Sequence, residues 1–167
     1  MAEKPLKILF LGAMAVGKSS IIKRLTVGEF DGDYKSTLGV QLHELSWPVD
    51  GKPRQIVLWD TDGDAEAGIV SSPYARGADA AMLVCDVERP RTAETLIELA
   101  EAMQDYLPGR PYIGVINKTD LKQPSHDMVE RVEDECDYIS LTSALDGRGL
   151  QDALTSLIRL IDARGEG

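Results

Sequence analysis

Short apolar runs alternate along the chain with longer segments whose apolar residues recur every three or four positions. Runs of strand length lie at residues 6–11, 40–49, 55–60, 80–85, 112–116 and 138–141, and helical spacing marks 18–26, 92–106, 127–135 and 150–161. Asp50-Gly51 is a hairpin signal, so the second and third runs should pair antiparallel. The pattern predicts an α/β fold, a mostly parallel six-stranded sheet with helices on both faces. The central strands, 80–85 and 112–116, should each end at functional residues.

Length and charge narrow the class of protein. The chain has 167 residues, 43% of them hydrophobic, which predicts a single domain spanning 1–167. A net charge of -10 disfavours nucleic acid and anionic lipid as general partners. No segment reaches the roughly 20 apolar residues of a membrane-spanning helix, and two cysteines without zinc-site spacing indicate reduced thiols. We therefore expect a cytoplasmic protein.

A glycine-containing segment separates the first predicted strand from the first predicted helix. It reads GAMAVGKS and matches GxxxxGK[ST], in which backbone N–H groups surround phosphates at a helix N-terminus. Lys18 would add a mobile cation, and the Ser19 hydroxyl is placed to ligate Mg²⁺. A glycine-rich structural turn is the alternative interpretation. The predicted phosphate-binding residues of this segment are Gly12, Ala13, Met14, Ala15, Val16, Gly17, Lys18, Ser19 and Ser20.

A second motif, Asn117-Lys118-Thr119-Asp120, follows the predicted strand 112–116. Ligands of open α/β sheets bind at the carboxyl ends of strands. Guanine presents a ring N–H beside an exocyclic amine, and the Asp120 carboxylate can accept from both, whereas adenine has no such donor pair. A solvated strand end capped by Asn117 and Asp120 is the alternative. Together with the phosphate loop, the motif predicts a site for GTP or GDP.

With these two motifs, the chain resembles the Ras-like small GTPases over nearly its whole length, with a spacing most similar to the Rab-type branch. Trp59-Asp60-Thr61 and Thr37-Leu38-Gly39-Val40 are further matches. The resemblance implies a P-loop G domain that binds GTP or GDP with Mg²⁺ and hydrolyses GTP. It also implies that segments 28–39 and 61–74 switch with the nucleotide and engage protein effectors or regulators.

The resemblance assigns roles to residues beyond the two motifs. Thr37 would contact Mg²⁺ and the γ-phosphate, Asp60 would hold the metal through water, and Gly63 would donate its N–H to the γ-phosphate. The implied metal set is therefore Ser19, Thr37 and Asp60, and Tyr34 would lie over the phosphates. The implied guanine-binding residues are Phe30, Asn117, Lys118, Asp120, Ser143, Ala144 and Leu145, the last standing where the family has Lys.

Two departures from the family pattern concern hydrolysis. The family has a Gln that orients the attacking water, but here Asp62-Gly63-Asp64 follows Thr61. An ionised Asp64 cannot donate a hydrogen bond and would face an anionic phosphate. Met14 stands where the family often has a small residue. The implied catalytic residues, Lys18, Thr37, Gly63 and Asp64, should therefore hydrolyse GTP slowly.

Three functions are consistent with a phosphate loop of this kind. The first is a slow GTPase switch, and the second is a GTP- or GDP-binding module with negligible turnover, whose state is set by nucleotide exchange. The third, an ATP-using P-loop kinase, would need a basic lid, and no basic cluster in the sequence supplies one. The last residues, Asp162 to Gly167, carry no prenylation Cys and no polybasic tail, so we expect no encoded lipid anchor.

The missing Gln gives a prediction about rate. Asp64→Gln should raise intrinsic GTP hydrolysis, because a neutral amide can donate to and accept from the attacking water and removes a repulsion of about 4 kcal/mol at 4 Å and an effective dielectric near 20. Single-turnover rates of the wild type, of Asp64→Gln and of Asp64→Gln with Met14→Gly measure the effect. An unchanged or slower rate in both variants would show that Asp64 is not the cause of slow hydrolysis.

Overall fold

Six strands form one sheet in the order β2-β3-β1-β4-β5-β6, seen in a computed structural model that describes residues 4–26, 40–61 and 67–165. The strands are β1 (Leu6–Gly12), β2 (Val40–Val49), β3 (Lys52–Thr61), β4 (Ala80–Asp86), β5 (Tyr112–Asn117) and β6 (Ile139–Leu141). The helices are α1 (Lys18–Leu25), α2 (Arg91–Tyr106), α3 (His126–Glu135) and α4 (Leu150–Gly165), with short 3-10 helices η1 (Ala67–Ile69) and η2 (Pro73–Ala75). The predicted fold class is confirmed.

The sheet is parallel except for the β2–β3 hairpin at one edge. Asp50 and Gly51 close this hairpin with φ angles of 51° and 82°, both in the left-handed region that a two-residue hairpin turn requires. Pairing continues up to Val49 opposite Lys52, so β3 begins three residues before the predicted start at residue 55. The hairpin signal in the sequence is confirmed.

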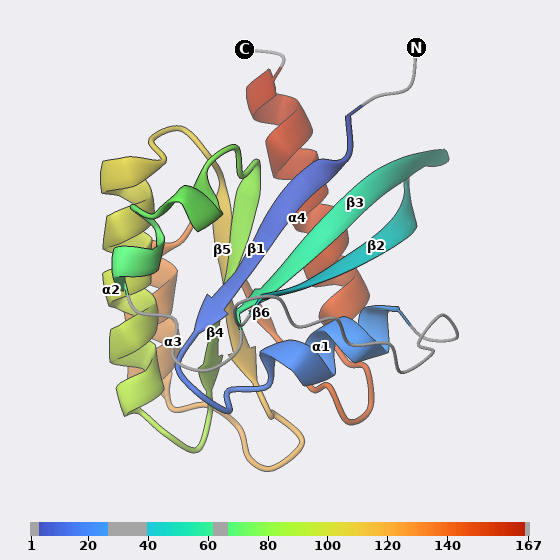
Figure 1. Cartoon of the computed structure of the whole chain (residues 1–167). Helices are drawn as coiled ribbons and strands as arrows, with labels where there is room; N and C mark the ends of the chain where they lie inside the picture. Colours follow the sequence, from blue (N-terminus) through green and yellow to red (C-terminus); the bar gives the residue numbers. More distant parts are fainter. Residues whose placement is uncertain (1–3, 27–39, 62–66, 166–167) are drawn as a thin grey trace.

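Two apolar layers cover the two faces of the sheet because side chains alternate along each strand. On β1, Leu9 and Leu11 pack in one cluster with residues of α2 and α3, whereas Ile8 and Phe10 pack in the other with residues of α1 and α4. All four side chains are fully buried. Figure 1 shows α2 and α3 on one side of the sheet and α1 and α4 on the other.

The two cysteines lie on one of these layers. Cys85 is fully buried in β4 and Cys136 is half-buried directly after α3, and neither forms a disulfide. Burial raises the pKa of each thiol to about 12, so both stay protonated at neutral pH. They behave as small apolar side chains of the core.

Gly114 of β5 allows α3 to approach the sheet and gives a testable prediction. A Cβ at this position would lie 2.5 Å from Val132 Cγ1 and 3.0 Å from Cys136 Sγ. Gly114→Ala should lower the free energy of unfolding by about 1–3 kcal/mol through overpacking. Combining it with Val132→Ala should cost less than the sum of the two single changes, because the smaller side chain makes room for the new methyl group.

Urea unfolding of the four proteins in this double-mutant cycle measures the coupling between positions 114 and 132. Additive losses would contradict the contact.

Candidate nucleotide-binding site

The phosphate loop leaves β1 at Gly12 and enters α1 at Lys18, as the motif predicted. Gly17 has a φ of 108°, and a Cβ there would lie 2.2 Å from Asn117 Nδ2. A Cβ at Gly12 would lie 2.5 Å from the Val84 carbonyl oxygen of β4. Both glycines are therefore required by close approach of neighbouring groups, and Gly17 also by its backbone conformation.

Lys18 is placed differently from the mobile cation that the sequence suggested. Only 5% of the residue is exposed, and its Nζ donates to the carbonyl oxygens of Gly12 at 2.7 Å and Ala13 at 3.4 Å. The ammonium thus lies across the inside of its own loop, where the first turn of α1 begins. A cation beside the N–H groups of a helix N-terminus is an arrangement that favours an anion.

The Ser19 hydroxyl and the Asp60 carboxylate meet beside the loop. Ser19 Oγ donates to Asp60 Oδ2 at 2.6 Å, although the two residues come from α1 and the end of β3. Asp60 is 2% exposed, and the next residue, Thr61, donates its hydroxyl to the Phe10 carbonyl oxygen at 2.9 Å. Two hard oxygen groups therefore stand together, and oxygen is the donor atom that Mg²⁺ prefers.

Asn117 joins the base motif to the phosphate loop. Its Nδ2 donates to the Val16 carbonyl oxygen at 3.0 Å, and its Oδ1 accepts from Thr142 Oγ1 at 2.9 Å. Asn117 is 1% exposed, so neither contact competes with water. The 117–120 motif, the 142–145 loop and the phosphate loop, which are far apart in the sequence, are thereby fixed relative to one another.

Asp120 lies at the exposed end of this arrangement. Its Oδ1 accepts from Ser143 Oγ at 2.8 Å, and the same hydroxyl accepts from the Asp146 N–H at 3.3 Å. Ser143 is buried, Ala144 is half-buried and Leu145 is exposed. The structure thus brings Asp120 and the 143–145 segment together, as the resemblance implied.

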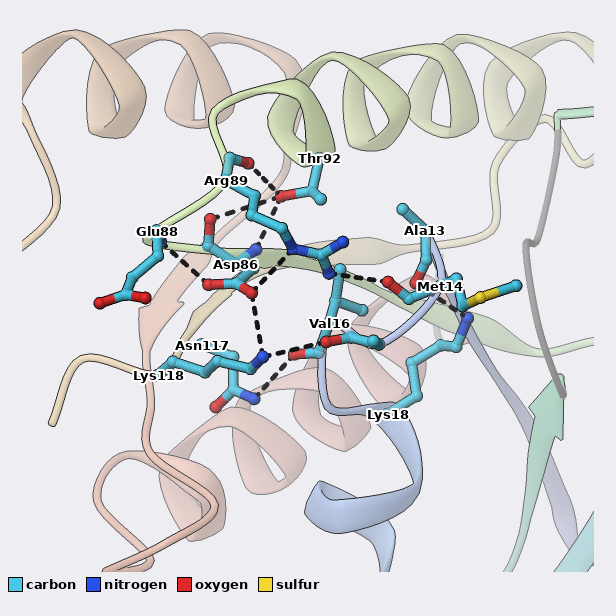
Figure 2. A network of polar contacts seen from close by, with 11 residues as sticks. Ala13, Met14, Val16, Lys18, Asp86, Glu88, Arg89, Thr92, Asn117 and Lys118 are labelled. Carbon is cyan, nitrogen blue, oxygen red and sulfur yellow. Dashed lines mark hydrogen bonds and ion pairs between the residues drawn. The ribbon is translucent and has the colours of Figure 1, made fainter. Parts of the chain in front are cut away.

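Lys118 crosses from the base motif to the phosphate loop. Its Nζ lies 3.0 Å from the Ala15 carbonyl oxygen and 3.0 Å from Asp86 Oδ2. Burial alone would raise the pKa of the Asp86 carboxyl, but hydrogen bonds from the Glu88 N–H, Lys118 and Arg89 together hold that pKa below its ordinary value. Asp86 is therefore ionised at neutral pH and anchors two cations (Figure 2).

Asp86 and Arg89 belong to this network of polar contacts, although the sequence motifs identified neither of them. Asp86 occupies the carboxyl end of β4, where the sequence predicted functional residues without identifying one. That position was the available signal for Asp86. For Arg89 there was none, because its contact with the Met14 carbonyl oxygen joins residues 75 positions apart.

A cavity of about 460 Å³ opens beside the phosphate loop. The residues that line it are Met14, Ala15, Gly17, Lys18, Ser19, Ser20, Thr61 and Lys118. Met14 is 56% exposed at its edge. Within the described residues, no three His, Cys, Asp or Glu side chains gather as a metal site.

Five of the predicted residues lie outside the part of the chain that the structure describes. They are Phe30, Tyr34, Thr37, Gly63 and Asp64. The predictions for these positions therefore remain predictions. Among the described helices, none combines the length and the apolar character needed to cross a bilayer.

Comparisons with known proteins agree with this geometry. The family model described as Ras family matches residues 7–163. The chain is 34% identical to the Ras-related protein Rab11E of Lotus japonicus, over 95% of this chain and 77% of the relative. It is 33% identical to the Ras-related protein RABA1b of Arabidopsis thaliana, over 93% of this chain and 74% of the relative.

These matches extend over the sheet, the helices and the motifs described above. They favour GTP turnover over the alternative of a binding module with negligible turnover, and they imply effector or regulator proteins as partners. The chain belongs to the Ras family and, within it, to the Rab branch of small GTPases: it is a switch that binds GTP and GDP with Mg²⁺ and hydrolyses GTP.

Proposed function

We propose that the cavity beside the phosphate loop holds the phosphates of GTP or GDP, and that the 117–120 and 143–145 segments hold the guanine. One observation carries this assignment. Asn117 Nδ2 donates to the Val16 carbonyl oxygen at 3.0 Å, which fixes the base motif directly against the phosphate loop. Neither motif needs to move far for one nucleotide to reach both.

In this proposal the phosphates bind to the backbone N–H groups of the loop from Gly12 to Ser20 and to Lys18. The buried Lys18 ammonium, now on the Gly12 carbonyl oxygen at 2.7 Å, would donate to a phosphate oxygen as well, since it has three protons. The N-terminus of α1 adds its partial positive charge. These local groups offset the unfavourable field of a chain with net charge -10.

The base is recognised by Asp120. The Ser143 hydroxyl holds one carboxylate oxygen at 2.8 Å, which orients the group while lone pairs on both oxygens remain for the guanine N–H and amine. Asp120 is exposed before the base binds, so its charge is desolvated only on binding, and a base without donors leaves that loss uncompensated. Ser143, Ala144 and Leu145 would line the same edge, with Phe30 and the stem of Lys118 against the ring faces.

Ser19 and Asp60 would hold Mg²⁺, Ser19 directly and Asp60 through water. Their oxygens already lie 2.6 Å apart, so binding of the cation would replace this hydrogen bond with a direct bond to Ser19 and a water-mediated contact to Asp60. When bound, Mg²⁺ neutralises charge on the β- and γ-phosphates. Thr37 completes the proposed metal set, Tyr34 covers the phosphates, and Lys18, Gly63 and Asp64 together with Thr37 form the proposed catalytic group.

The proposal extends to the setting of the protein. Residues 1–167 would act as one G domain in the cytoplasm, where GTP and Mg²⁺ are supplied. Protein effectors or regulators would contact segments 28–39 and 61–74, which respond to the γ-phosphate in switches of this kind. The net charge of -10 argues against nucleic acid as a partner.

Guanine recognition gives the main test. Chromatography of the nucleotide released from the purified protein should show GDP or GTP, and dissociation constants should favour GTP over ATP. Asp120→Ala should weaken the affinity for GTP by at least about 10²-fold, because two charge-assisted hydrogen bonds are lost, each contributing about 1.5–3 kcal/mol. Asp105→Ala removes the same charge from an exposed end of α2 and serves as the control. Equal affinities for ATP and GTP in the wild type would refute the assignment.

Metal binding gives a second test. Chelation of Mg²⁺ should speed GDP release from the wild type, whereas Ser19→Ala should release GDP quickly with or without chelator, because its metal ligand is gone. Ser19→Thr keeps the hydroxyl and should respond to chelation as the wild type does. Release of a fluorescent GDP analogue, followed over time with and without EDTA, measures the response. If Ser19→Ala stays as sensitive to EDTA as the wild type, Ser19 is not a metal ligand.

A further inference from the structure

Side-chain donors hold the carbonyl oxygens of the phosphate loop in an unbroken series. A loop that turns its N–H groups toward an anion turns its carbonyl groups away, and those groups need donors of their own. Side chains supply a donor to each of five consecutive carbonyl oxygens. Lys18 Nζ serves Gly12 at 2.7 Å and Ala13 at 3.4 Å, Arg89 Nη2 serves Met14 at 2.7 Å, Lys118 Nζ serves Ala15 at 3.0 Å, and Asn117 Nδ2 serves Val16 at 3.0 Å.

Arg89 is the donor in this series that belongs to neither nucleotide motif. It lies between β4 and α2, and two nitrogens of its guanidinium donate hydrogen bonds to different partners. Nε donates to Asp86 Oδ2 at 3.1 Å, while Nη2 reaches the Met14 carbonyl oxygen (Figure 2). The planar guanidinium fixes the angle between these two bonds, which a single ammonium group cannot do.

Asp86, which holds Arg89, is itself fixed by further hydrogen bonds. It is 2% exposed, and its Oδ1 accepts from the Glu88 N–H at 2.9 Å while its backbone N–H donates to Thr92 Oγ1 at 2.8 Å. Its Oδ2 takes both Arg89 and, at 3.0 Å, Lys118. One buried carboxylate thus holds the two cations that brace neighbouring carbonyl groups, those of Met14 and Ala15.

The braced part of the loop is also its strained part. Ala15 has a φ of 62°, in the left-handed region that residues with a side chain disfavour. A strained residue keeps such a conformation only where its surroundings impose it. The bonds to the carbonyl oxygens of Met14, Ala15 and Val16, on and beside the strained residue, impose it here.

We propose that Arg89 is a positioning residue for the nucleotide phosphates: by holding the Met14 carbonyl against Asp86, it keeps the loop N–H groups convergent and slows nucleotide release. The inference rests on the proposed function of the phosphate loop and adds a residue from outside its motifs. Because Arg89 acts on the loop and not on the base, its loss affects nucleotides with different bases equally.

The test compares Arg89→Gln and Arg89→Lys with Arg91→Gln, a control that removes the same charge two residues further along, from an exposed position at the start of α2. The probes are GDP and inosine diphosphate, which lacks the exocyclic amine that Asp120 would recognise. Loss of the charge-assisted hydrogen bond to the Met14 carbonyl group should speed GDP release about tenfold in Arg89→Gln. Inosine diphosphate should be released faster by the same factor, and Arg89→Lys should lie between Arg89→Gln and the wild type.

Urea unfolding of the nucleotide-free proteins separates positioning from a general loss of stability. Unchanged unfolding midpoints with faster release support the proposal. Release at the wild-type rate from Arg89→Gln overturns it, and so does faster release matched by a lower midpoint that Arg89→Lys does not restore. A wild type without preference for guanine would refute the proposed function itself, whereas a guanine-selective wild type with an unaffected Arg89→Gln would refute the role of Arg89 alone.

Discussion

The hydrogen bond from Asn117 Nδ2 to the Val16 carbonyl oxygen is the constraint on which the rest of the site depends. It is buried, and Thr142 holds the other end of the same amide at 2.9 Å, so the side chain has one orientation. Gly17 has to be glycine because this amide passes where a Cβ would be. The geometry of the phosphate loop is therefore set partly by a residue a hundred positions away.

The order of the strands makes this contact possible. β1 pairs with β4 and β4 pairs with β5, all parallel, so the chain leaves the three strands at the same edge of the sheet. In register, Gly12 lies beside Val84 and Asp86 beside Asn117. The phosphate loop, the Asp86–Arg89 turn and the base motif thus begin side by side, which is the usual place for ligands in open α/β sheets (Figure 1).

Charge is distributed unevenly about this edge. The chain as a whole carries a net charge of -10, yet Lys18, Arg89 and Lys118 all contact the carbonyl groups of one short loop. The buried Asp86 carboxylate holds two of these cations, and its lowered pKa keeps it ionised over the neutral range. Because cations and N–H groups are concentrated around the loop, an anionic ligand finds local attraction that the overall field does not provide.

The sequence by itself determined the fold class, the order of the elements and the two nucleotide motifs. These are local properties: the alternation of apolar residues sets strands and helices, Asp50-Gly51 sets the hairpin, and GxxxxGK[ST] sets a strand, a loop and a helix. The 3-10 helices η1 and η2 gave no such signal, because three residues are too few to show a period. No sequence signal marked the extension of α4 to Gly165 either, because its last residues add no apolar repeat.

Only the tertiary structure decided how the motifs engage one another. It buried Lys18 against the Gly12 carbonyl group, brought the Ser19 hydroxyl onto Asp60, and placed Arg89 on the phosphate loop. The Ser19–Asp60 and Arg89–Met14 contacts join residues far apart in the sequence and depend on which strands are neighbours, whereas Lys18 lies only six positions after Gly12. Strand order is settled by packing of the whole sheet, and no short stretch of sequence encodes it.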